Sequence, residues 1–271
     1  MRLPLVRLTA ALMLTGCSGT VVTSERPARE TQRPTPVLVE LFTSEGCSSC
    51  PAADTLLARM LTEQPIEGVE IIGLSLHVDY WNRLGWSDPY SKGEFTVRQN
   101  DYAAVWGPDR VYTPQAVVDG SKEFVGSDWL AARKHILEAA AAPKVPVTVD
   151  VEAPSPGSEQ VSVRVSVGPS KTSASKVNVV LALTEDGLVS EVRRGENANR
   201  TLSHVGVVRE LRRVARADAG AAVTTTTIVK LNPRWRSDQL RLVAIVQDQA
   251  SNQVIGVAAR RLLIAPQPAV D

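Results

Sequence analysis

Two cysteines, Cys47 and Cys50, lie where a predicted buried strand gives way to a predicted helix. The strand is the apolar run 37–42, and the helix that follows has its apolar residues at helical spacing: Ala53, Leu56, Leu57 and Met60. A second apolar strand is predicted at 69–78, and such a strand-helix-strand unit favours a parallel pair with a right-handed crossover. The cysteine pair is therefore expected at one edge of a parallel sheet, at the first turn of a helix.

Further elements complete an α/β unit in the first half of the chain. A helix is predicted over 92–105, and two short strands at 115–118 and 122–125 flank Asp119-Gly120, a strong hairpin-turn signal. An alanine-rich helix over 129–142 follows, with Ser127 or Asp128 available as its N-cap. The predicted order of elements is β-α-β-α-β-β-α.

The second half of the chain has a different pattern. Valine-rich segments with alternating polarity are separated by polar turns, and six strands are predicted, at 145–151, 160–167, 177–183, 223–231, 240–247 and 254–263. The polar segment 193–200, with His204 nearby, is expected to be a solvated loop, or alternatively a loop that contacts a partner. The fold class predicted is an α/β domain over 37–143 followed by an all-β sandwich-like domain over 144–266.

The N-terminal residues are typical of an exported bacterial protein. Arg2 and Arg7 flank an apolar run that is too short to span a membrane, which predicts a signal peptide over 1–16. The segment Leu14-Thr15-Gly16-Cys17 resembles the lipobox of bacterial lipoproteins, which implies that Cys17 is lipidated and becomes the first residue of the mature protein. We therefore expect a flexible tether over 17–36 and a location in the bacterial cell envelope, lipid-anchored and facing the periplasm or the exterior.

The charge and the cysteine count narrow the function. The formal net charge is only +1, so no nucleic-acid partner is expected. The chain has three cysteines, and assigning Cys17 to lipid leaves Cys47 and Cys50 as a pair with no second cysteine pair to complete a zinc site. In an oxidising compartment such a pair forms a disulfide or exchanges with the thiols of a partner. The helix N-terminus favours a thiolate on Cys47, which leaves Cys50 as the resolving thiol; no cofactor is predicted.

The motif Cys47-Ser48-Ser49-Cys50, together with Thr113-Pro114 just before a strand, resembles the thioredoxin superfamily. The resemblance implies a thioredoxin-like domain over 37–143, with Thr113 and Pro114 at the catalytic site and a cis proline facing the disulfide. Segments 39–54, 77–81 and 113–115, and in the second half 195–197 and 202–204, also resemble an uncharacterised family of secreted bacterial thioredoxin-like proteins, the domain of unknown function DUF1223. That family carries no established activity. Because Ser48-Ser49 replaces the Gly-Pro of thioredoxin, the direction of electron flow stays open.

These observations predict an exported thiol-disulfide oxidoreductase that acts on the thiols or disulfides of envelope proteins. His77 and Asp79 end the second strand and are predicted as a proton relay, whereas Glu45 opposes thiolate formation if it approaches Cys47. One alternative is a carrier of copper or another soft metal that uses Cys47, Cys50 and His77. The pattern is also compatible with a non-catalytic adaptor that has this fold, and with an inert local disulfide.

Overall fold

The computed structural model describes residues 33–107, 109–152, 159–169 and 174–262. The predicted signal peptide, the predicted lipidation residue Cys17 and most of the predicted tether lie outside these residues. The described residues belong to one compact unit. None of their helices is long and apolar enough to cross a membrane.

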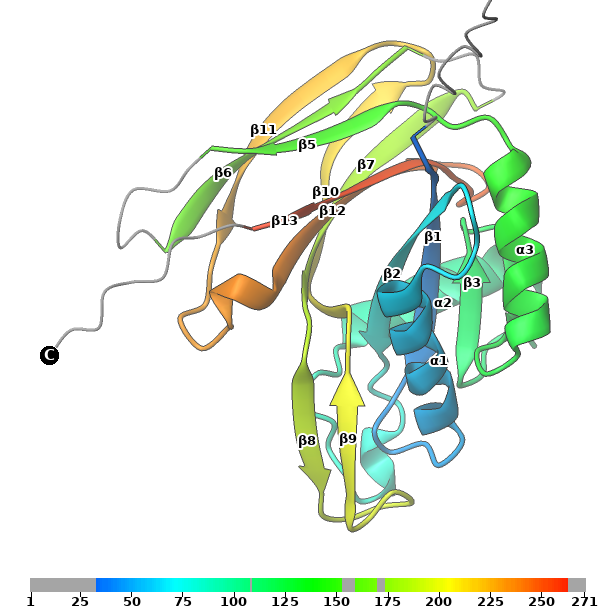
Figure 1. The fold of residues 1–271 in the computed structure, drawn as a ribbon, viewed down its shortest axis with the longest axis vertical. Coiled ribbons are helices and arrows are strands. Elements are labelled where there is room, and N and C mark those ends of the chain that lie inside the picture. The colour runs from blue at the N-terminus through cyan, green and yellow to red at the C-terminus, as the bar shows by residue number, and fades with distance from the viewer. Residues whose placement is uncertain (1–32, 108, 153–158, 170–173, 263–271) are drawn as a thin grey trace, which may run out of the picture. The chain divides into compact units, whose positions relative to one another are not determined.

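The first half follows the predicted order of elements (Figure 1). These elements are β1 (Thr35–Thr43), α1 (Cys50–Glu63), β2 (Val69–His77), α2 (Gly93–Trp106), β3 (Gln115–Val118), β4 (Lys122–Val125) and α3 (Trp129–Ala141), with a short 3-10 turn, η1 (Asn82–Leu84), before α2. The predicted hairpin turn is confirmed, because Asp119 and Gly120 both have positive φ angles, 44° and 62°. Asp128 caps α3 by accepting a hydrogen bond from the backbone N–H of Ala131 at 3.0 Å.

The second half contains the six predicted strands and three more. The predicted ones are β5 (Val147–Val151), β6 (Gln160–Val167), β7 (Lys176–Glu185), β11 (Val223–Lys230), β12 (Leu240–Asp248) and β13 (Val254–Arg261). The additional ones are β8 (Leu188–Val192), β9 (Arg200–His204) and β10 (Val207–Asp218), and a 3-10 turn, η2 (Ser237–Gln239), precedes β12. The segment predicted as a polar loop thus becomes the tip of a β8–β9 hairpin (Figure 1).

One eight-stranded mixed sheet joins the two halves, in the order β13-β12-β7-β10-β2-β1-β3-β4. β1 and β2 are parallel, as predicted, and β10 pairs in parallel with β2 at Val207 and Ser75. The backbone N–H of Ser75 also donates to the carbonyl of Gly206 at 2.8 Å. The sequence predicted two successive domains, but four strands of the second half extend the sheet of the first half. A three-stranded antiparallel sheet, β11-β6-β5, and the two-stranded β8-β9 sheet complete the described architecture.

Alternate residues of β1 face two different layers. Val37, Val39 and Leu41 pack with the apolar residues of α1 and α3, whereas Leu38 and Phe42 pack on the opposite face with α2. Because both faces of β1 are covered, the strand is an almost continuous apolar run. The strand thereby fixes the position from which the chain enters the cysteine motif.

A separate core lies in the second half. Valines of β6 in the three-stranded sheet pack against apolar residues of β7 and β12 in the large sheet. Burying apolar surface stabilises a fold by roughly 25 cal/mol per Å². The apolar surface buried between the two sheets therefore holds the small sheet on the large one. The second half is therefore both a continuation of the large sheet and a layer on top of it.

Candidate functional site

Cys47 and Cys50 form a disulfide at the start of α1, with their Cα atoms 5.4 Å apart. The helix begins at Cys50. Pro51 suits the first turn because proline has no backbone N–H that would be left without an acceptor there. The backbone N–H of Cys50 donates to the carbonyl of Cys47 at 3.2 Å. Both cysteines are 0% exposed, although Ser48 and Ser49 between them are exposed. The predicted position of the pair, between a strand and a helix N-terminus, is confirmed.

The structure also brings Thr113 to the disulfide. The hydroxyl of Thr113 donates to Sγ of Cys47 at 3.4 Å, and the indole N–H of Trp81 donates to the same hydroxyl at 2.8 Å. The Thr113-Pro114 peptide bond is cis, as the resemblance to thioredoxins implied. The sequence-predicted residues Cys47, Cys50 and Thr113 are therefore neighbours in space.

A buried group of ionisable side chains flanks the cysteine motif, and we call it the histidine–carboxylate cluster. Its members are Glu45, Asp54, His77, Asp88 and His204, all of them buried. Nδ1 of His77 lies 2.7 Å from a carboxylate oxygen of Asp88, and Nε2 of His204 lies 3.1 Å from one of Glu45. The two imidazole rings contact each other edge to face, with their centroids 4.8 Å apart. Because buried charges are costly unless paired, so many ionisable groups in one place indicate a functional site.

The structure shows which groups contact His77, Asp79 and Glu45, the ionisable residues predicted beside the cysteines. His77 does belong to the cluster, but its carboxylate partner is Asp88, while Asp79 accepts a hydrogen bond from the hydroxyl of Thr96 at 2.6 Å. The carboxylate of Glu45 accepts from the indole N–H of Trp86 at 2.7 Å and pairs with His204. The Glu45 carboxylate is therefore engaged by Trp86 and His204 in the protein interior.

Sequence reasoning missed Asp54, Asp88 and His204 as members of this site. Asp54 carried a usable signal, because it is an acidic residue beside Ala53 on the apolar side of a helix, and such a residue needs a buried partner. That partner is the hydroxyl of Thr43, which donates to Asp54 at 2.8 Å. His204 lies in the segment 202–204, which also fits the resemblance to DUF1223, but nothing local marks it as buried.

Burial and mutual charge shift the pKa values within the cluster. Burial raises the pKa of Asp54 above its ordinary value, and this outweighs the nearby histidines, which lower it. Burial lowers the pKa of His77, but the carboxylates around it, Asp88 first and then Asp54 and Glu45, together outweigh burial, so the net shift is upward. For Asp88, burial raises the pKa, yet His77 and two backbone N–H groups bring it below its ordinary value. Both shifts therefore favour the charged forms of the His77–Asp88 pair.

The cluster also retains proton-binding atoms with no hydrogen-bond partner among the described residues. These atoms are Nε2 of His77 and Nδ1 of His204. The latter lies 3.8 Å from a carboxylate oxygen of Asp54, beyond hydrogen-bond distance. The cluster can therefore accept or release a proton without breaking the hydrogen bonds that hold its members in place.

The His77–Asp88 pair predicts a pH dependence of stability. The raised pKa of His77 means that its contribution is complete below about pH 6.5 and is lost as the pH rises through the folded-state pKa. The lowered pKa of Asp88 means that its contribution is present above about pH 4 and is lost as the pH falls. Denaturant unfolding of the wild type and of Asp88→Asn between pH 5 and pH 9 should show a difference that shrinks on the alkaline side. A difference that does not change with pH would contradict the pairing.

No metal site is evident in the described part of the chain. No group of three or more His, Cys, Asp or Glu side chains there is arranged to hold a metal ion. In the alternative set, the sulfurs of Cys47 and Cys50 are joined to each other, and Nδ1 of His77 is engaged by Asp88. The geometry of this oxidised form therefore does not favour the metal-carrier alternative.

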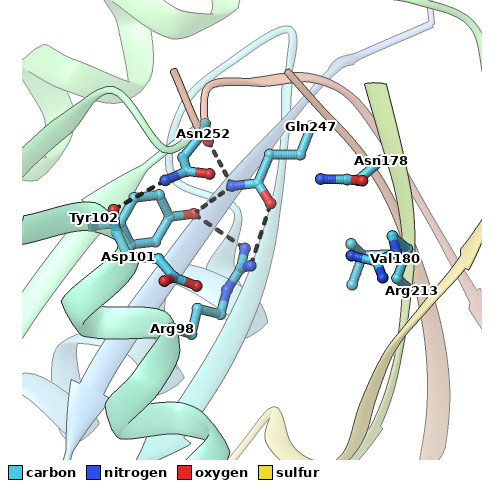
Figure 2. A pocket seen from close by; sticks show the side chains of 8 residues that line it. All are labelled: Arg98, Asp101, Tyr102, Asn178, Val180, Arg213, Gln247 and Asn252. Atoms are coloured by element: carbon cyan, nitrogen blue, oxygen red, sulfur yellow. Dashed lines mark hydrogen bonds between the residues drawn. The ribbon is translucent and has the colours of Figure 1, made fainter. Parts of the chain in front are cut away.

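A second polar region lies between α2 and the second-half strands of the large sheet. It is a cavity of about 160 Å³, and Figure 2 shows the side chains that line it: Arg98, Asp101, Tyr102, Asn178, Val180, Arg213, Gln247 and Asn252. The guanidinium of Arg98 binds both carboxylate oxygens of Glu40, a fully buried residue of β1, at 2.5 and 3.0 Å. It also donates to the hydroxyl of Tyr102 and the side-chain oxygen of Gln247. These groups satisfy one another and join α2 to both halves of the sheet.

Together these features define a mixed α/β protein with a Cys-x-x-Cys disulfide at a helix N-terminus, backed by a buried histidine–carboxylate cluster. A family model described as "Protein of unknown function (DUF1223)" matches residues 38–247. The chain belongs to this family, and the matched range includes the disulfide, Thr113 and the whole cluster. No curated protein matches the chain.

Solved structures that resemble the chain over most of its length include the following two. Protein AGR_C_4864 from Agrobacterium tumefaciens is 26% identical, with a TM-score of 0.65, and the match covers 89% of this chain and 99% of that one. HBP35 of Porphyromonas gingivalis is 13% identical, with a TM-score of 0.64 over 89% of this chain and 79% of that one. The second similarity is one of fold alone.

Proposed function

We propose that this protein is an exported thiol-disulfide oxidoreductase that acts through Cys47 and Cys50 on the thiols or disulfides of envelope proteins. The observation that carries the proposal is the disulfide at the N-terminus of α1, with the Thr113 hydroxyl on Sγ of Cys47. Unpaired N–H groups at a helix N-terminus stabilise a thiolate, which is the reactive form of cysteine. The order of elements around the pair supports a thioredoxin-like first half, with a sandwich-like second half.

The exchange reaction has two steps. In the reduced protein, the thiolate of Cys47 attacks a partner disulfide, forming a mixed disulfide and releasing one partner thiolate. The thiolate of Cys50 then attacks Sγ of Cys47, which releases the second partner thiolate and forms the Cys47–Cys50 disulfide. The partner gains two electrons and two protons, and this protein loses them. The reverse sequence oxidises a partner dithiol.

The histidine–carboxylate cluster supports this chemistry, because each step moves protons to or from a thiol. Asp54 lies four residues after Cys50, one turn along the same helix face, and its raised pKa favours a bound proton. His77 and His204, in the same cluster as Asp54, each have one ring nitrogen without a hydrogen-bond partner among the described residues: Nε2 of His77 and Nδ1 of His204. We therefore assign the proton-relay role to His77, Asp54 and His204.

A second candidate is an inert disulfide that only stabilises the β1–α1 connection, as in a non-catalytic adaptor. The complete burial of both cysteines in the oxidised state favours this candidate, because a partner thiol must reach one of the sulfurs. Against it, the loop that the disulfide closes is very short, so the chain-entropy model gives it a stabilisation of only about 2 kcal/mol.

A disulfide-reduction assay distinguishes the two candidates. With dithiothreitol as the electron donor, we expect the full chain to accelerate the reduction of insulin, and Cys47→Ser to abolish the acceleration. Cys50→Ser should instead trap a mixed disulfide between Cys47 and the substrate, visible on a non-reducing gel. A wild-type chain with no acceleration and a disulfide that resists dithiothreitol until the protein unfolds would favour the inert candidate.

The proposed location depends on residues 1–17, which lie outside the described residues. An acylated Cys17 would tether the protein to a bacterial membrane, facing the periplasm or the exterior, without spanning it, and multi-chain lipidation makes such anchoring stable. Membrane fractionation tests this directly, because a Cys17→Ala chain that stays in the membrane fraction would refute the anchor.

A further inference from the structure

The tip of the β8–β9 hairpin binds the backbone of the cysteine motif. Asn197 at this tip is 0% exposed, and its side-chain amide donates to the carbonyls of Glu45 at 2.9 Å and Cys47 at 2.8 Å. Arg200 donates to the side-chain oxygen of Asn197 at 3.1 Å, which fixes the orientation of the amide. The second half of the chain thus holds the turn that carries Cys47.

Glu196, the neighbouring residue, places a carboxylate at the same turn. Its side-chain oxygen accepts a hydrogen bond from the backbone N–H of Ser48 at 2.9 Å, directly before the N-cap residue Ser49 of α1. Hydrogen bonds from Ser48 lower the pKa of Glu196, so the carboxylate is ionised at neutral pH. A negative charge therefore already occupies the helix terminus that would stabilise a thiolate on Cys47.

We propose that Glu196 and Asn197 are positioning residues that favour the disulfide form of the Cys47–Cys50 pair, and so make the protein more reducing. The proposal rests on the redox function proposed above. Two electrons and two protons convert the disulfide into two thiols, and any group that disfavours the thiolate of Cys47 opposes this conversion. The carboxylate of Glu196 acts through its charge.

Asn197 acts by a different route. Reduction separates the two sulfurs, and any accompanying shift of the Cys47 backbone has to stretch or break the hydrogen bonds from Asn197. The two hydrogen bonds from the Asn197 amide hold that backbone in the conformation seen with the disulfide closed. The loss of these bonds is therefore expected to favour the dithiol, in the same direction as the loss of the Glu196 charge.

The test is the reduction potential of the pair in the full chain, measured by equilibration in dithiothreitol buffers and alkylation of free thiols. Glu196→Gln keeps an oxygen acceptor for Ser48 and removes only the charge. We expect it to shift the equilibrium about three- to tenfold toward the dithiol, which corresponds to a potential about 14–30 mV higher. The alkylation rate of Cys47 at neutral pH should rise as well, and the shift should shrink at high salt.

The matched control is Glu191→Gln, because Glu191 is an exposed acidic residue of β8 in the same hairpin. This variant should keep the wild-type potential. Asn197→Ala should raise the potential further than Glu196→Gln, and circular dichroism of its reduced and oxidised forms checks that it is folded.

Two results would overturn the proposal. One is a Glu196→Gln variant whose dithiol–disulfide equilibrium constant lies within about twofold of the constants of the wild type and of Glu191→Gln. The other is a shift toward the disulfide. In both cases the pair would still be redox-active, and the proposed function would stand. If no chain can be reduced without unfolding, the proposed function and this inference fail together.

Discussion

Replacing Arg98 with alanine should lower the free energy of unfolding by about 3–5 kcal/mol. Arg98 is the bidentate partner of Glu40, which lies in the middle of β1 with no solvent exposure. Removing the guanidinium leaves a buried carboxylate that keeps the hydroxyl of Tyr102 as a hydrogen-bond donor but loses its cation. The free energy of unfolding falls because the Glu40 carboxylate is then an unpaired charge that water cannot solvate. Urea unfolding monitored by circular dichroism measures the change.

The matched control is the exposed pair of Arg59 and Glu63 on α1. Their side chains are 3.5 Å apart, and they are 65% and 52% exposed. Arg59→Ala should cost at most about 0.5 kcal/mol, because water screens and replaces the lost partner. The double variant Glu40→Met/Arg98→Met should recover much of the loss of Arg98→Ala. Equal effects of Arg98→Ala and Arg59→Ala would contradict the assignment of a buried, coupled pair.

Replacing Gly120 with alanine should destabilise the protein by about 2–5 kcal/mol. The positive φ angle of 62° costs an L-residue about 1–2 kcal/mol, and the added Cβ would press into the carbonyl oxygen of Asn252, for which about 1–3 kcal/mol is typical. The turn cannot move away, because Asp119 accepts hydrogen bonds from Leu38 and Val254. Thermal unfolding measures the loss.

Gly68 provides the control for this variant. It has a similar φ angle of 74°, but an added Cβ there would meet no atom within 4 Å. Gly68→Ala should therefore show the backbone cost of about 1–2 kcal/mol and no more. The difference between the two variants isolates the contact between the β3–β4 turn of the first half and the β12–β13 turn of the second. Equal losses would mean that the two halves do not press on each other at Gly120.

Local sequence patterns predicted most of the first half correctly. The apolar run of β1, the helical spacing in α1 and the Asp119-Gly120 turn each depend on residues within a few positions of one another. For that reason the position of Cys47 and Cys50 at a strand-to-helix junction was predictable. Some of the second-half strands lacked such patterns. β10 carries four arginines, Arg209, Arg212, Arg213 and Arg216, and does not alternate cleanly between buried and exposed residues.

The sequence by itself determined the cysteine pair, its place at the start of a helix and the order of the elements around it. Only the tertiary structure decided what surrounds the pair. Asn197 and Cys47 are 150 residues apart, and His204 reaches Glu45 across 159. These contacts exist because β10 pairs with β2 and brings the β8–β9 hairpin to the edge of the sheet where the cysteines lie. No local pattern encodes such a pairing, because it depends on how two distant apolar surfaces are buried together.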